Sequence, residues 1–219
     1  QSETLAAVGE MGLAVAHGIR NPLAAIRSSA ELNLETSDPQ SRESAQDIIA
    51  EVDRVESWVR ELLSYARPVT GQAHSVDLGT LLGECLAEFE RETARRDIVI
   101  ARHIPGDLPP VRFDPLLLGQ VAGNLVANAC EAIGHAGCIT VRAEAADRSV
   151  RLAVEDDGPG LAPEELARVF TPFYTTKARG MGLGLPLTKR ILERFGGSIT
   201  VDSAPGRGTR VELMLPTAA

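Results

Sequence analysis

Apolar residues in the first third of the chain recur at alternating steps of three and four residues, and no other feature of the sequence constrains the fold as strongly. The first run begins at Leu5 and ends at Ile26, and the second begins at Ala45 and ends at Ala66. This spacing is typical of a coiled-coil or helix-bundle seam. Between the runs, Asp38-Pro39 is suited to cap and begin a new helix. The pattern therefore predicts an antiparallel helical hairpin.

Two helices alone cannot bury both of their apolar faces, so the hairpin needs a further surface to pack on. A second copy of the chain would complete a four-helix bundle, and we expect this homodimer. The alternative is that the hairpin packs on its own C-terminal domain. Arg67-Pro68 ends the second helix, and the polar residues 69–75 are typical of a linker. We therefore predict a hairpin domain over residues 1–72 and a second domain over 73–219.

Beyond the linker the pattern changes from long heptad helices to short mixed elements. We expect helices at 78–96, 115–133 and 183–195, and strands at 98–104, 138–145, 150–154, 198–202 and 209–215. Helices and strands mixed in this way predict an α/β sandwich, in which helices cover one face of a sheet.

Charge and composition exclude several classes of protein. The 219 residues carry 22 basic and 30 acidic side chains, and this net charge of −8 argues against a nucleic-acid binder. No apolar run approaches the roughly 20 residues of a membrane helix, and the N-terminus does not resemble a signal peptide. The three cysteines are too few and too scattered for a disulfide framework or a zinc site. A reducing, cytoplasmic setting fits this composition best.

His17 is the first candidate for chemistry. Its offset from the seam residues places it on the solvent side of the first helix, and Asn21 follows one turn later on the same face. Asn21-Pro22 interrupts the helix, because proline removes a backbone hydrogen bond. A neutral imidazole is nucleophilic near pH 7, so His17 could accept a group from a second domain. The alternative is an ordinary surface histidine.

Two glycine-rich turns lie in the second domain. In VEDDGPGL (154–161), Asp156 could accept a hydrogen bond from an exocyclic amine, while Gly158 and Gly160 would let the backbone approach a flat ligand. GMGLGL (180–185) directly precedes a helix, an arrangement in which free amides bind phosphate. Each motif taken alone is equally compatible with a plain tight turn.

Polar side chains on an otherwise apolar helix form a further candidate. Asn124 and Asn128 lie four residues apart, so they share one helical face. Their amide oxygens could bind a hydrated Mg²⁺, although satisfied core residues or caps are the alternative. Lys177 is one of only two lysines, beside 20 arginines. A compact ammonium at this position indicates, weakly, a phosphate contact.

Taken in order, the segments HGIRNP, NLVANACEA, DDGPG, FTPFYTTK, GMGLGL and GRGT resemble the sensor histidine kinases of two-component signalling. The resemblance extends from about Leu5 to Pro216, and the TTK segment is most similar to the nitrogen-regulation subgroup. It implies a dimeric hairpin with His17 as phosphoacceptor. It also implies that the second domain is the ATP-binding sandwich shared with gyrase-type ATPases.

The resemblance further implies roles for individual residues, with ATP and Mg²⁺ as the cofactors. Asn128 would hold Mg²⁺ with support from Asn124. Asp156 would read the adenine amine, Gly158 and Gly160 would line the base pocket, and Thr209 would lie near the base. The residues expected to close over the phosphates are Lys177 and the turn of Gly180, Gly182, Leu183, Gly184 and Leu185.

The chain departs from the family at Gly18, where the residue after the phosphoacceptor is usually acidic. A general base typically contributes about 10²–10⁴-fold, so its absence predicts a slower kinase step. Asn21 occupies the position that the family associates with phosphatase activity. We expect autophosphorylation of His17, phosphotransfer to an aspartate on a response-regulator receiver domain, and phosphatase activity toward that regulator. The alternative is a phosphatase-biased or non-catalytic, nucleotide-sensing dimer. The chain is expected to be the cytoplasmic part of a longer sensor.

Overall fold

The computed structural model describes residue 19 and residues 22–34, 38–177 and 180–218. By their contacts the residues form two compact units. One comprises Gln1–Pro68 with Thr175–Leu183, and the other comprises Val69–Tyr174 with Gly184–Ala219. Each unit is described separately, and we call them the helical unit and the sandwich unit.

The helical unit contains an antiparallel helical hairpin. Residues 22–34 are helical, and α2 extends over Pro39–Ala66. The hydroxyl and the backbone N–H of Ser41 both donate to the carboxylate of Asp38, and these bonds, the hydroxyl bond first, hold the pKa of Asp38 below its usual range. Ile19 packs against Val59 and Leu63 near the end of α2. An apolar contact between the start of one helix and the end of the next confirms the predicted antiparallel direction.

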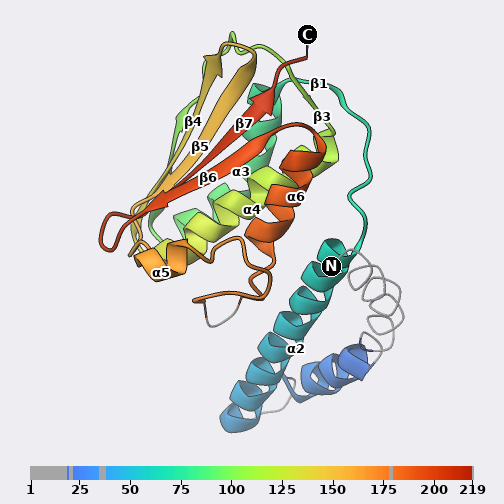
Figure 1. Ribbon diagram of the computed structural model, residues 1–219. Coiled ribbons are helices and arrows are strands. Elements are labelled where there is room, and N and C mark those ends of the chain that lie inside the picture. Colours follow the sequence, from blue (N-terminus) through green and yellow to red (C-terminus); the bar gives the residue numbers. More distant parts are fainter. Residues whose placement is uncertain (1–18, 20–21, 35–37, 178–179, 219) are drawn as a thin grey trace. The chain divides into compact units, whose positions relative to one another are not determined.

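The sandwich unit is built on a five-stranded mixed sheet with the order β2-β4-β5-β7-β6 (Figure 1). β2 pairs with β4 in parallel, and the remaining pairs are antiparallel. The five strands are β2 (Ile98–His103), β4 (Gly137–Ala146), β5 (Ser149–Asp156), β6 (Ser198–Ser203) and β7 (Thr209–Pro216). The expected sandwich fold is therefore confirmed.

Three helices cover one face of this sheet, and the other face is open (Figure 1). They are α3 (Leu78–Ala94), α4 (Pro115–Ile133) and α6 (Gly184–Arg194). Alternate strand residues point to opposite faces, so β5 buries Val150, Leu152 and Val154 beneath the helices. Arg151 and Glu155 lie on the open face instead. The core therefore lies between one face of the sheet and the helical layer.

Short elements complete the unit, and the sequence pattern did not predict them. β1 (His74–Val76) pairs antiparallel with β3 (Val111–Phe113), so part of the expected linker is a strand. α5 (Pro163–Leu166) is a single helical turn. Three- and four-residue elements are too short to show a hydrophobic period.

Among the described residues, α4 alone is long and apolar enough to cross a membrane. Its buried side chains instead form part of the sandwich core, where it packs beside α3 and α6.

Candidate nucleotide site

The site is organised along α4. Pro115 begins this helix, and the carboxylate of Asp114 accepts hydrogen bonds from the backbone N–H groups of Leu116 (3.0 Å) and Leu117 (3.1 Å). These bonds satisfy donors that a helix N-terminus leaves free. The apolar face of α4 is buried in the core, whereas Asn124 and Asn128 are only partly buried. The helix thus holds its two amides at the edge of the core.

Asn124 lies where α4 meets the beginning of α6. Its Nδ2 donates to Oγ1 of Thr188 over 2.8 Å, and Thr188 is itself buried. A Cβ atom on Gly184, the first residue of α6, would overlap the side-chain amide of Asn124. The first turn of α6 carries backbone N–H groups without intrahelical partners, including those of Gly184 and Leu185. Asn124 is therefore held beside a helix N-terminus that can bind phosphate.

The turn after β5 packs against the last turn of α4. Oδ1 of Asp156 accepts from the backbone N–H of Gly158 over 3.0 Å. A Cβ on Gly158 would lie 3.2 Å from the carbonyl carbon of Ala132 in α4. A side chain would therefore separate the turn from the helix. Along α4, Asn124 and Asn128 are therefore followed by Ala132, the residue against which this turn packs.

Gly160 and Gly208 bring the turn against the loop between β6 and β7. Their φ angles are +71° and +73°, in the left-handed region that favours glycine. A Cβ on Gly160 would overlap the carbonyl of Ala204, and one on Gly208 would overlap that of Asp156. Thr209, the next residue, is the register partner of Asp156 on the neighbouring strand. Asp156, predicted to read the base, and Thr209, predicted to lie near it, are therefore neighbours.

Sequence reasoning missed several residues that hold this site in place. Oδ1 of Asp157 accepts from the N–H of Cys138 on β4 over 2.9 Å. The hydroxyl of Ser203 donates to the carbonyl of Gly208 (2.8 Å) and accepts from the N–H of Leu161 (2.9 Å). In the sequence, the pair of aspartates directly before Gly158 is a local signal that could have pointed to Asp157. For Ser203 and Thr188 the signal lies only in the tertiary fold.

The remaining phosphate-loop candidates belong to the helical unit. In Thr175–Leu183 the backbone N–H of Lys177 donates to Oγ1 of Thr175 over 3.0 Å, Gly182 has a φ of +70°, and Leu183 is buried. Gly180 lies close to Thr175 and Lys177. This short segment therefore folds back on itself.

Aromatic side chains precede this segment in the sandwich unit. Arg168 lies 4.0 Å from the ring centroid of Tyr174, and Lys189 lies 5.3 Å from that of Phe170. These cation–π contacts hold Tyr174 and Phe170 within the sandwich unit. Phe173 lies between them in sequence and is 58% exposed.

His17, Gly18 and Asn21 lie outside the described residues.

The sandwich fold, the glycine turns packed around α4 and the helix N-terminus beside Asn124 define a nucleotide-binding domain. Residues 113–219 match the family described as "Histidine kinase-, DNA gyrase B-, and HSP90-like ATPase", and residues 7–71 match the "His Kinase A (phospho-acceptor) domain". The chain belongs to the sensor histidine kinases of two-component systems.

Curated relatives align in sequence with almost the whole of this chain. It is 38% identical to the sensor histidine kinase ZraS of Escherichia coli strain K12 over 218 residues, which is 99% of this chain and 47% of ZraS. It is 36% identical to the signal transduction histidine-protein kinase AtoS of the same strain, covering 99% of this chain and 36% of AtoS. The chain thus spans less than half the length of these relatives.

Solved structures agree with this assignment. Full-length ShkA in complex with AMPPNP superposes with a TM-score of 0.79 at 28% identity, over 96% of this chain and 47% of that one. Histidine kinase ThkA in complex with the response regulator protein TrrA gives a TM-score of 0.74 at 30% identity, over 99% and 64% of the two chains.

Proposed function

We propose that this chain binds ATP, phosphorylates itself on His17 and passes the phosphoryl group to an aspartate on a response-regulator receiver domain. We assign residues 1–72 to dimerisation and phosphotransfer and residues 73–219 to ATP binding. This reaction belongs to the cytoplasmic part of a longer sensor. The glycine-built cradle along α4 is the observation that carries the proposal.

The cradle fits an extended nucleotide. Eight residues separate Asn124 from Ala132, and a helix rises 1.5 Å per residue, so about 12 Å separate the two ends of the site. The base end has Asp156, which can accept a hydrogen bond from the adenine amine, beside Gly158, Gly160 and Thr209. The phosphate end has Asn124 and the amides of the first turn of α6. The family resemblance implies that Lys177, Gly180, Gly182 and Leu183 would close over the phosphates.

Asn128 is the residue that we assign to magnesium. Mg²⁺ prefers oxygen ligands and keeps several waters and phosphate oxygens, so one amide oxygen suffices from the protein. Among the described residues no group of three or more His, Cys, Asp or Glu side chains could hold a metal. Because one amide oxygen is enough from the protein, Asn128 fits a metal that arrives with the nucleotide. When bound, Mg²⁺ neutralises charge on the phosphates.

The protein's own contribution to transfer is positioning. A neutral ring nitrogen of His17 attacks the γ-phosphorus, so a phosphorus–nitrogen bond forms while the bond to the ADP oxygen breaks. The imidazole must lose its proton in this step, and Gly18 supplies no acidic neighbour to receive it. A slower autophosphorylation than in kinases with an acid at this position is the expected consequence.

Exposed apolar side chains favour the homodimer. Ile26, Leu32 and Ile48 are 48%, 70% and 43% exposed within a single hairpin. Ile26 and Ile48 belong to the two predicted seams, whereas Ala45, Val52 and Val59 of the same seams are buried. Removing such side chains from water is favourable by roughly 25 cal/mol per Å². A second hairpin would cover them.

Incubation with radiolabelled ATP tests the proposal. The full chain should give an acid-labile, base-stable phosphoprotein, and His17→Ala should abolish the label while leaving nucleotide affinity unchanged. Asp156→Asn should weaken ATP binding by about tenfold or more, because a bond to a charged acceptor is lost. Asp147→Asn, in the exposed turn between β4 and β5, is the matched control. Label that persists in His17→Ala would contradict the phosphoacceptor assignment.

Gly18 and Asn21 favour a second candidate, a phosphatase-biased switch. The amide of Asn21 would orient a water that attacks the aspartyl phosphate of the regulator. Gly18→Glu should then raise the initial rate of autophosphorylation, while Asn21→Ala should abolish dephosphorylation of the regulator and spare the kinase step. An unchanged rate in Gly18→Glu would remove the argument from Gly18. ATP binding without phosphohistidine or regulator dephosphorylation would leave a nucleotide-sensing dimer.

A further inference from the structure

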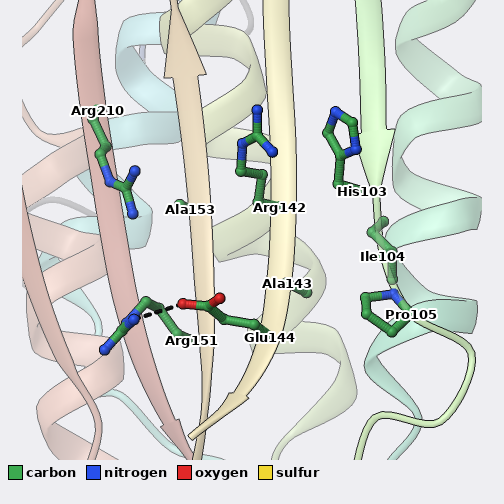
Figure 2. A pocket seen from close by; sticks show the side chains of 9 residues that line it. All are labelled: His103, Ile104, Pro105, Arg142, Ala143, Glu144, Arg151, Ala153 and Arg210. Atoms are coloured by element: carbon green, nitrogen blue, oxygen red, sulfur yellow. Dashed lines mark hydrogen bonds and ion pairs between the residues drawn. The ribbon is translucent and has the colours of Figure 1, made fainter.

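The open face of the sheet has a hollow of about 530 Å³ that the nucleotide reaction does not use (Figure 2). Its floor is Ala153 of β5, which is only 2% exposed although no described helix of the sandwich unit covers this face. Arginine side chains from β4, β5 and β7 surround it, and Ile104 and Pro105 form one wall; the complete lining is His103, Ile104, Pro105, Arg142, Ala143, Glu144, Arg151, Ala153 and Arg210. The hollow is thus basic on one side and apolar on the other.

Two of the three lining arginines are already paired with carboxylates. Arg210 contacts Glu155 (2.6 Å) and Glu212 (2.7 Å). These neighbours raise the pKa of Arg210, chiefly through its hydrogen bond to Glu212. Arg151 contacts Glu144 (2.5 Å) and Glu212 (3.4 Å). Three acids of this face, Glu144, Glu155 and Glu212, therefore belong to one connected network with Arg151 and Arg210.

Arg142 stands outside this network. Its register partners are His103 on β2 and Ala153 on β5, and neither is acidic. It makes no ion pair or hydrogen bond with any residue that the structure describes. Paired strand residues point to the same face, so the imidazole of His103 lies beside this guanidinium, as Figure 2 shows. Among the described residues, Arg142 is therefore the lining arginine that pairs with no carboxylate.

We propose that this hollow binds a small organic carboxylate. The planar guanidinium of Arg142 can donate two parallel hydrogen bonds to a carboxylate, and His103 can donate a third. Ile104 and Pro105 offer an apolar surface for the body of the ligand. The volume is within the range of ordinary small-molecule pockets, roughly 300–1,000 Å³. Because the apolar wall favours carbon over a bare oxyanion, the site selects a carboxylate rather than inorganic phosphate.

Benzoate is the probe that tests this site. The full chain is first saturated with AMPPNP and Mg²⁺, so that the nucleotide pocket cannot capture the anion. Titration should shift the NMR signals of the Arg142 side chain and of His103, Ala143 and Ala153, with a dissociation constant on the order of 1 mM. Benzamide has the same shape without the charge, and it should bind about tenfold more weakly or worse. Acetate and inorganic phosphate, which lack the apolar body, should also bind more weakly than benzoate.

Two variants separate this site from general attraction of anions. Arg142→Gln should remove benzoate binding. Arg102→Gln is the matched control, because Arg102 neighbours His103 in sequence but pairs with Glu90 of α3 on the helix-covered face. Equal affinity for benzoate and benzamide would overturn the proposal. So would binding that survives Arg142→Gln, shifts confined to other residues, or a preference for phosphate. None of these readouts depends on His17 or on phosphoryl transfer.

Discussion

At the scale of single residues, backbone crowding makes the base end of the nucleotide site sensitive to one methyl group. Gly160 approaches the carbonyl of Ala204, and Gly208 approaches that of Asp156. Both have positive φ, so neither the space nor the conformation accepts a side chain. The loop between β6 and β7 therefore depends on glycine at both contact points.

Gly160→Ala should lower the free energy of unfolding of the sandwich unit by about 1–3 kcal/mol, through strain at positive φ. It should also weaken ATP binding, because the displaced turn carries Asp156. Gly119→Ala is chemically the same change in the middle of α4, where a Cβ meets no atom within 4 Å. It should stabilise the unit by roughly 0.5–1 kcal/mol. Urea denaturation of both variants measures the contrast, and equal effects would contradict the crowding argument.

At the scale of elements, α4 depends on a residue far from it in sequence. Nε and Nη2 of Arg96 donate to the carbonyls of Gly134 (2.9 Å) and Cys130 (3.1 Å), at the C-terminus of the helix. A cation there binds carbonyls at the helix end and complements the helix dipole. The same turn of α4 carries Ala132, against which the base-binding turn packs. Arg96 thus supports the base end from the opposite side.

Arg96→Gln should destabilise the sandwich unit by about 1–3 kcal/mol, because hydrogen bonds from a charged donor to partly buried carbonyls are lost. Amide exchange should accelerate in peptides that cover residues 128–137. Arg95→Gln removes the same charge from an exposed neighbouring side chain and should change neither quantity. Unaltered exchange at the end of α4 in Arg96→Gln would show that the cap is dispensable.

The start of α3 makes stability depend on pH. The backbone N–H and hydroxyl of Thr80 both donate to the carboxylate of Asp77 (3.1 Å each), and these bonds lower the pKa of Asp77. A carboxyl with a lowered pKa stabilises the fold above its unfolded pKa, about pH 4, and loses this contribution as pH falls through the folded value. Asp77→Ala should therefore lower the melting temperature equally at pH 7 and pH 5.

The gap between wild type and Asp77→Ala should close only at lower pH. Asp77→Asn keeps a capping acceptor without a titrating group, so its melting temperature should lack this particular pH dependence. A gap that persists undiminished at pH 2.5 would contradict the role of the charged carboxylate.

Sequence reasoning predicted the elements that are long enough to show a hydrophobic period, including every strand of the five-stranded sheet. α4 begins and ends at Pro115 and Ile133, the predicted positions, because a proline, an aspartate cap and a following glycine mark both ends locally. β1, β3 and α5 lack enough residues to show a period. The contacts between Asn124 and Thr188, or between Arg96 and Gly134, join residues far apart in the chain. Such contacts depend on the tertiary fold, which residue spacing alone does not reveal.

At the scale of the whole molecule, self-association should depend on the hairpin. We expect sedimentation equilibrium to give a mass near twice the 23.3 kDa of one chain. Ile48→Glu should dissociate this dimer, because it places a charge on an exposed seam position. Leu116→Glu is the control, since Leu116 is 84% exposed on α4 of the sandwich unit. If Leu116→Glu dissociated the dimer and Ile48→Glu did not, the interface would belong to the sandwich unit and the prediction would be wrong.

The strand order has a consequence for how this protein is made. β7 is the last strand in sequence, but it lies between β5 and β6 inside the sheet. When the ribosome has released the chain as far as Ser203, β5 and β6 are therefore exposed without the strand that lies between them. Until Pro216 leaves the exit tunnel, the edges of β5 and β6 that β7 will occupy stay unpaired and can pair with another chain. We expect the sheet to close only after β7 has emerged, so a chaperone should bind most readily before Pro216 leaves the exit tunnel.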